Sequence, residues 1–176
     1  MHNMHNLAGQ AVSVFGCGNM LIGDDGFGPA VIEDLQSGHD FPDNILIEDV
    51  GTGIREYLFD FILAPDTAPR QLIILDAVDF KDRTPGEVFT ITPDTIPVEK
   101  IHDFSLHQFP TVNLLQEIAE HTGAAVHIIA AQVEHIPDEI APGLTPSMQK
   151  AVKEASEKVR ELLSIICPQT CEVTQP

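Results

Sequence analysis

The feature of the sequence that most restricts its fold is the alternation of short apolar runs with segments of helical periodicity. This alternation is typical of α/β proteins, in which helices cover an open sheet. We therefore predict an α/β fold with a single, mostly parallel five-stranded sheet and helices on both faces. The predicted strands are 11–16, 44–50, 71–78, 86–93 and 124–133, and the predicted helices are 27–38, 54–64, 111–122 and 145–164.

Two of the predicted strands have distinctive patterns. The run QLIILDAV at 71–78 is the most apolar, which predicts a central strand that is covered on both faces. The run GEVFTITP at 86–93 alternates apolar and polar residues with period two, which is typical of an antiparallel or edge strand, and we expect one antiparallel strand in the sheet. Ahead of the last helix, Thr145 is a predicted N-cap and Pro146 suits the first helical position.

The composition excludes several classes of protein. A chain of 176 residues, of which 43% are hydrophobic, can bury the core of one domain, and we expect flexible ends at 1–10 and 165–176. The net charge of −18 repels nucleic acid and anionic membranes, so neither is an expected partner. No apolar run has the length of a membrane span, and the three cysteines form no even-numbered framework. We predict a cytoplasmic monomer.

The stretch VFGCGNMLIGDDGFGPAVIEDL, at 14–35, has the layout of a phosphate-binding turn between a strand and a helix. A dinucleotide site needs the spacing G-x-G-x-x-G. Gly16 and Gly18 match this spacing, but the third position is Leu21. An acid also ends the second strand, as a ribose-binding acid would. A nucleotide-binding oxidoreductase module therefore stays open as an alternative.

Two consecutive acids in this turn, Asp24 and Asp25, argue against that alternative. A phosphate at the start of the helix would meet two fixed negative charges, which would cancel the attraction of the helix N-terminus. The same acids suit a cation. The sequence therefore favours a cation over a nucleotide at this turn.

Three residues could meet at one edge of the predicted sheet. Asp25 follows the first strand, Asp76 lies at the end of the third, and His107 lies in the irregular segment before the third helix. In open parallel sheets the functional site lies outside the carboxyl ends of the strands. Two carboxylates and an imidazole suit a borderline divalent ion such as nickel or zinc. Each residue also has an ordinary structural explanation, and His102 competes with His107 as the third ligand.

Nucleophilic catalysis has little support in the sequence. The chain has no G-x-S-x-G elbow. Cys17 lies in the turn, but neighbouring acids disfavour its thiolate, so we expect it to pack in the core.

Five motifs occur in order along the chain and together carry a family resemblance. They are GCGNMLIGDDGFG (16–28), DVGTG (49–53), IILDAVD (73–79), SLHQ (105–108) and GLTP (143–146). Together they resemble the nickel–iron hydrogenase maturation endopeptidases over residues 11–163. Among the branches of that family, the chain is most similar to the proteases for the deazaflavin-reducing hydrogenase of methanogenic archaea.

The resemblance implies a set of site residues. The metal-contacting triad of the family falls on Asp25, Asp76 and His107. Many members have Glu at the first of these positions, and Asp25 is one methylene shorter. Asp49, from the D-x-G-T-G motif, is implied as a catalytic or structural residue of the cleft. The catalytic residues implied by the resemblance are therefore Asp25, Asp49, Asp76 and His107.

The resemblance also implies the reaction. Such enzymes remove a C-terminal extension from the hydrogenase large-subunit precursor after nickel insertion, so nickel arrives with the substrate and no nucleotide is needed. The metal could polarise the scissile carbonyl or a water, or it could anchor the precursor while Asp25 or Asp49 activates water. A non-catalytic nickel chaperone, with the same ligands but no cleavage, is a further alternative.

Overall fold

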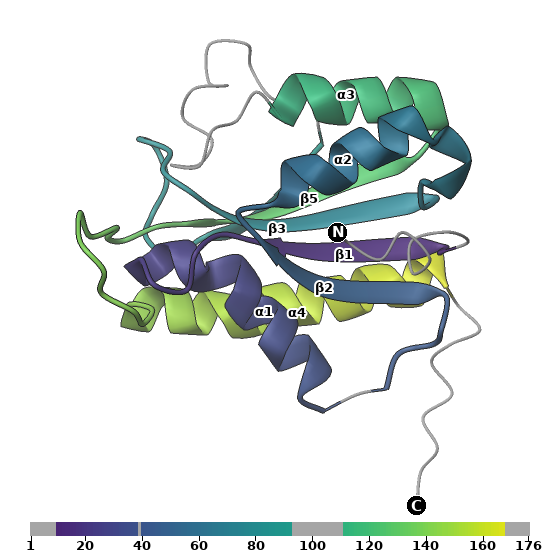
Figure 1. Cartoon of the computed structure of the whole chain (residues 1–176). Coiled ribbons are helices and arrows are strands. Elements are labelled where there is room, and N and C mark those ends of the chain that lie inside the picture. The colour runs from purple at the N-terminus through teal and green to yellow at the C-terminus, as the bar shows by residue number, and fades with distance from the viewer. Residues whose placement is uncertain (1–9, 39, 93–110, 168–176) are drawn as a thin grey trace, which may run out of the picture.

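The computed structural model describes residues 10–38, 40–92 and 111–167. Within these ranges the strands are β1 (Val12–Cys17), β2 (Ile45–Gly51), β3 (Gln71–Val78), β4 (Val88–Ile91) and β5 (Ala125–Gln132). They form one sheet in the order β2-β1-β3-β5-β4 (Figure 1). β1, β2, β3 and β5 run parallel, and β4 pairs antiparallel with β5. The predicted fold, including its single antiparallel strand, is confirmed.

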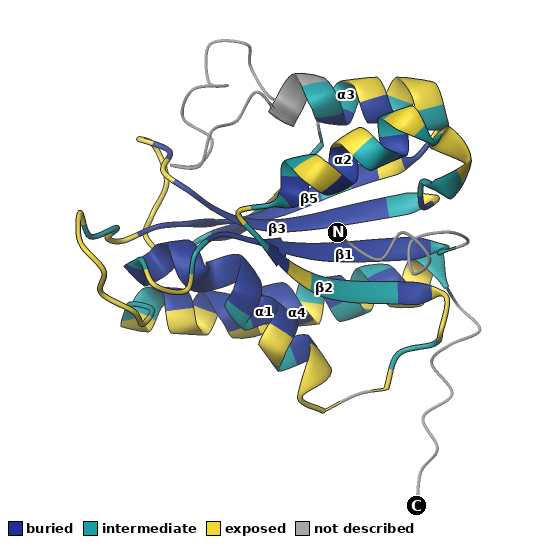
Figure 2. Ribbon diagram, viewed as in Figure 1, coloured by how far each residue is buried: buried dark blue, intermediate teal, exposed yellow. Residues whose placement is uncertain are grey.

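Helices cover both faces of the sheet (Figure 1). One face carries α1 (Phe27–Gln36) and α4 (Pro146–Ile166), and the other carries α2 (Ile54–Leu63) and α3 (Thr111–Thr122). β1 illustrates how period two separates the two cores: Phe15 and Cys17 join the α2–α3 side, whereas Val12 and Val14 join the α1–α4 side. β3, as predicted, is buried along nearly its whole length (Figure 2).

The helix starts follow from local chemistry. Thr145 is the N-cap of α4, its side chain accepting a hydrogen bond from the amide of Met148 at 3.4 Å, and Pro146 is the first helical residue. Both predictions are confirmed. The helix runs on to Ile166, two residues past its predicted end. Among the described residues, no helix combines the length and the apolar character that crossing a bilayer requires.

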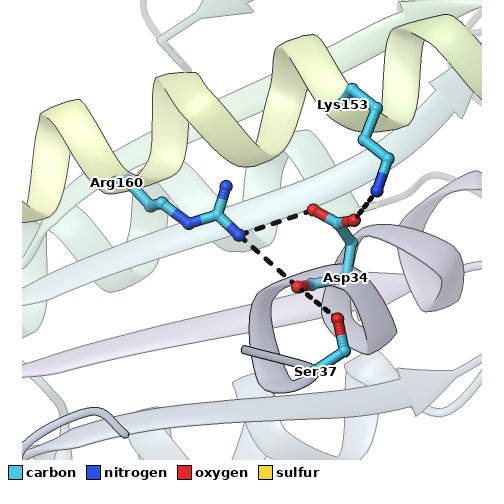
Figure 3. A network of polar contacts seen from close by, with 4 residues as sticks. All are labelled: Asp34, Ser37, Lys153 and Arg160. Atoms are coloured by element: carbon cyan, nitrogen blue, oxygen red, sulfur yellow. Dashed lines mark hydrogen bonds and ion pairs between the residues drawn. The ribbon is translucent and has the colours of Figure 1, made fainter. Parts of the chain in front are cut away.

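A small ionic cluster joins α1 to α4 (Figure 3). Asp34 of α1 forms ion pairs with Lys153 and Arg160 of α4, the latter at 3.5 Å between Oδ2 and Nη2. Ser37 donates a hydrogen bond to the carbonyl oxygen of Asp34 at 3.0 Å. The cluster lies nine residues along the chain from Asp25, so it holds the two helices together away from the glycine-rich turn.

The strand order creates a switch point between β1 and β3. The chain leaves β1 to form β2 on one side and then crosses to form β3 on the other. Pairing of β1 with β3 ends at Gly16 and Leu75, whereas β3 continues beside β5, with Asp76 opposite Ala130. Ligands of open α/β sheets bind outside the carboxyl ends of strands at such a point. The fold therefore places Asp76 at the expected position for a site.

Candidate active site

The glycine-rich turn folds tightly against the ends of β1 and β3. After β1, the chain forms a 3-10 turn, Gly23–Gly26, that leads into α1. Gly18 has φ 122°, and a Cβ there would lie 1.9 Å from the carbonyl oxygen of Asp25. A Cβ on Gly28 would lie 2.3 Å from the carbonyl oxygen of Cys17 and 2.5 Å from that of Leu75. These glycines are needed because backbone packs directly on backbone.

Asp25 and Asp76 come together at this point. Their exposed fractions are 1% and 3%. Asp25 Oδ2 accepts a hydrogen bond from the Asn19 amide at 2.6 Å, and Asp76 Oδ1 accepts one from the Ala77 amide at 2.9 Å. Burial, and then the negative charge of Asp25, raises the pKa of Asp76 to about 8. Asp76 therefore retains its proton near neutral pH.

The side chain of Asp76 points to the α2–α3 face of the sheet. Asp76 lies two positions from both Ile74 and Val78 in β3, and these two residues belong to the core on that face. α3 begins at Thr111, directly after the segment that carries the predicted third ligand. His107, and its competitor His102, lie outside the described residues, so the structure does not test the histidine of the triad.

Asp49 lies at the same rim but in a different setting. It pairs with Gly16 near the end of β2, is exposed, and its Oδ1 accepts a hydrogen bond from the Gly51 amide at 2.9 Å. It lines a groove of about 440 Å³ whose other walls come from α1 and the loop after β1. These other lining residues are Met20, Pro29, Ile32, Glu33, Gln36 and Ser37. Asp49 is therefore accessible from solvent, unlike the buried acid pair.

Asp24 serves a role that the sequence did not indicate. It was grouped with Asp25 as an acid suited to a cation, but its carboxylate is fully buried and accepts four hydrogen bonds from the protein itself. The donors belong to Glu134, His135 and Thr145. A sequence signal existed only for Thr145, and it predicted helix capping alone. The long-range partnership could not be read from spacing.

Cys17 packs in the core, as predicted. It is buried, and burial, together with the negative charges of Asp76, Asp49 and Asp25, raises its thiol pKa well above the ordinary value. A thiol in such surroundings stays protonated and is a poor nucleophile. This confirms the expectation that Cys17 packs in the core.

The described part of the chain does not by itself form a metal site. Within it, no three or more His, Cys, Asp or Glu side chains lie close enough to hold an ion together. The acid pair of Asp25 and Asp76 offers oxygen ligands from two elements, and any third ligand must come from another segment or from a bound substrate.

Comparison with known proteins identifies the family. A family model described as hydrogenase maturation protease matches residues 29–162. The chain belongs to the hydrogenase maturation protease family. The protease is 30% identical over 157 residues to the coenzyme F420 hydrogenase subunit delta of Methanothermobacter thermautotrophicus, covering 88% of this chain and 95% of the relative. It is also 30% identical over 151 residues to the hydrogenase 2 maturation protease of Escherichia coli, covering 84% and 87%.

Solved structures agree with this assignment. The protease superposes on the hydrogenase maturating endopeptidase HybD from E. coli with a TM-score of 0.66 and 28% identity, covering 89% of this chain and 93% of HybD. The fold is also that of the [NiFe] hydrogenase maturation protease HycI from Thermococcus kodakarensis, with a TM-score of 0.67, 24% identity, and coverage of 92% and 97%. The chain is thus a peptidase of hydrogenase maturation, and the family resemblance of its motifs is confirmed. Its likeness to a coenzyme F420 hydrogenase subunit agrees with the predicted branch, because coenzyme F420 is a deazaflavin.

Proposed function

We propose that this endopeptidase removes the C-terminal extension of a hydrogenase large-subunit precursor only after nickel has been inserted, and that it reads the nickel directly. The observation that carries the proposal is the buried pair of Asp25 and Asp76 at the switch point of the sheet. Two carboxylates with exposed fractions of 1% and 3% are costly to keep ionised together. A divalent cation delivered by the substrate would remove that cost, so the acid pair suits this cargo.

Asp25, Asp76 and His107 are the proposed contacts to the nickel of the precursor. Carboxylate oxygens and an imidazole nitrogen form a mixed donor set that a borderline divalent ion accepts. Asp76, whose pKa is raised to about 8 in the free protein, would release its proton when the cation arrives. The free enzyme therefore keeps Asp76 protonated near neutral pH, and arrival of the nickel-loaded precursor would ionise it.

Two roles for the nickel of the substrate in peptide hydrolysis are compatible with this arrangement. The nickel of the substrate would polarise the scissile carbonyl, or it would anchor the precursor while an acid activates water. Asp49 suits the second role, because it is exposed and faces a groove beside the turn. Asp25 is the other candidate base. Loss of turnover in a folded Asp49→Asn variant would assign the activation of water to Asp49, whereas retained turnover would leave Asp25 as the base or the nickel as the polarising group.

The experiment uses nickel-loaded and nickel-free precursor, each incubated with the protease, with the products weighed by mass spectrometry. The branch similarity makes the large subunit of a coenzyme F420-reducing hydrogenase the first precursor to test. We expect cleavage of the loaded precursor alone, and its loss in Asp25→Asn, Asp76→Asn and His107→Ala. Asp34→Asn, a carboxylate of the α1–α4 ionic cluster, is the matched control that keeps activity.

Each of the other outcomes rejects a defined part of the proposal. Equal cleavage of both precursors would show that nickel is not read. Binding of loaded precursor without any cut would indicate the chaperone alternative. Normal cleavage by all three site variants would show that the site lies elsewhere.

A further inference from the structure

The carboxylate of Asp24 joins two loops that are far apart in sequence. Its Oδ2 accepts hydrogen bonds from the amides of Glu134 at 2.9 Å and His135 at 3.1 Å, and from the Thr145 hydroxyl at 3.0 Å. Its Oδ1 accepts one from the Thr145 amide at 2.7 Å. The loop after β5, between Val133 and Thr145, is thus tied at both of its ends to one side chain of the glycine-rich turn.

Backbone contacts fasten the same two segments next to Asp24. The Gly23 amide donates to the carbonyl oxygen of Ala141 at 2.9 Å, and the Ala141 amide donates to that of Leu21 at 2.9 Å. Ile22 and Ala141 form a parallel β-bridge. The turn that presents Asp25 is therefore held from one side by the loop that leads into α4.

Asp24 and Asp25 have different partners although they are consecutive. The four side-chain hydrogen bonds of Asp24 described above all come from the β5–α4 loop. The side chain of Asp25 instead accepts a hydrogen bond from the Asn19 amide, and its charge raises the pKa of Asp76. Fixing the Asp24 side chain fixes the peptide between the two residues, and hence the place from which the Asp25 side chain starts. Reacting groups displaced by about 1 Å can lose about 100-fold in rate.

We propose that Asp24 is a positioning residue of the protease, which acts through Asp25 by locking the turn against the β5–α4 loop. The inference rests on the proposed function in so far as Asp25 contacts the nickel of the precursor. Asp24 itself touches neither substrate nor cation. A buried carboxylate that accepts four hydrogen bonds specifies a single arrangement of both loops, whereas an apolar side chain in its place would leave the four donors without acceptors.

The test is the isosteric substitution Asp24→Asn. The amide has one oxygen, so at least one oxygen position becomes an NH₂ group that faces an N–H or O–H donor. We expect kcat on nickel-loaded precursor to fall about 10- to 100-fold, as for partners that orient a metal ligand. We also expect faster amide hydrogen exchange in peptides that cover 18–26, with β3 unchanged. Thr145→Val, which removes one of the four bonds and also the N-cap of α4, should give an intermediate loss of kcat.

Asp34→Asn is the matched control, because it is an equally conservative change to a carboxylate of the α1–α4 ionic cluster that bonds across helices (Figure 3). It should lower the melting temperature without changing kcat or the exchange of 18–26. Wild-type kcat and exchange in Asp24→Asn would overturn the inference, and so would faster exchange spread evenly over the whole sheet, which marks a purely structural role. If the wild-type protein cuts no precursor, the proposed function fails, and the exchange measurement alone still decides the role of Asp24. Should Asp24→Asn not fold, Thr145→Val with wild-type kcat and exchange would overturn the inference.

Discussion

Asp76 shares its buried surroundings with Asp25, and the charge of Asp25 helps to raise the pKa of Asp76 from 3.8 to about 8. The two residues belong to different elements, the turn after β1 and the third strand, and meet only because β1 and β3 are neighbours in the sheet. Their proximity lowers the folding stability of the free enzyme, and this effect can be measured without any substrate.

The first prediction concerns stability against pH. Between pH 3.8 and about 8 the folded protein binds a proton at Asp76 that the unfolded chain has released, so folding becomes less favourable as pH rises through this window. Asp76→Asn removes the buried charge. We expect this variant to be more stable than the wild type near pH 8 and similar to it near pH 3.8. Urea denaturation at several pH values measures the difference, and a gap that does not change with pH would contradict the prediction.

The second prediction concerns Asp34, whose pKa is lowered in the folded protein, so that its effect on stability changes with pH in the opposite direction. Burial alone would raise the pKa of Asp34, but its hydrogen bond with Lys153 and the charges of Lys153 and Arg160 lower it below 3.8. Its contribution to stability is therefore present above pH 3.8 and is lost as pH falls through the folded-state pKa. Asp34→Asn should destabilise the protein at neutral pH, by about 1 kcal/mol because the pairs are partly exposed. The difference should vanish in acid, and its persistence there would assign the effect to packing.

The third prediction concerns the close backbone packing at Gly18. Gly18→Ala would force a Cβ against the carbonyl oxygen of Asp25, at a φ of 122° that L residues rarely adopt. We expect a loss of at least about 2 kcal/mol and a displaced Asp25. Gly38→Ala is the control, since no atom lies within 4 Å of the position of its Cβ, and it should change stability by less than about 0.5 kcal/mol. Chemical denaturation and cleavage assays measure both variants, and equal behaviour would refute the argument.

The fourth prediction concerns the thiol of Cys17. Because burial and three nearby carboxylates keep it protonated, iodoacetamide should leave Cys17 unmodified in the native protein, while the partly exposed Cys167 is alkylated. Cys17→Ala should keep its cleavage activity and lose about 1 kcal/mol of stability from the buried volume. Peptide mapping after alkylation checks the first expectation. Loss of activity in a folded Cys17→Ala protein would give the thiol a catalytic role.

Periodicity made the fold predictable, because strands and helices bury their faces with different repeats. The run QLIILDAV was placed at the centre of the sheet from its apolar character, and the third strand occupies the same residues, Gln71–Val78. The antiparallel strand was found in the same way, although β4 is shorter than the alternating run 86–93. Strand ends were less predictable, since they depend on how far each strand pairs with its neighbours in the sheet.

The site was predictable only in part. The rule that sites lie at the carboxyl ends of parallel strands predicts that Asp25 and Asp76 meet there, and both are buried close enough for the charge of Asp25 to act on Asp76, while their role in a site stays a prediction. The separate roles of Asp24 and Asp25 were not readable, because adjacent acids look alike in sequence and differ only in what folds against them. Asp24 is matched by donors more than a hundred positions away. The role of His107 stays a prediction.

The insertion of β1 between β2 and β3 has a consequence for the newly made chain. The two buried acids are brought together only when the third strand docks on the first, and the loop that braces the turn is added later still, from beyond the fifth strand. A chain in which β3 has not docked on β1 therefore carries Asp25 and Asp76 but cannot bring them together. The acid pair is thus a product of long-range strand pairing, and the segment that braces its turn is among the last parts of the chain to be synthesised.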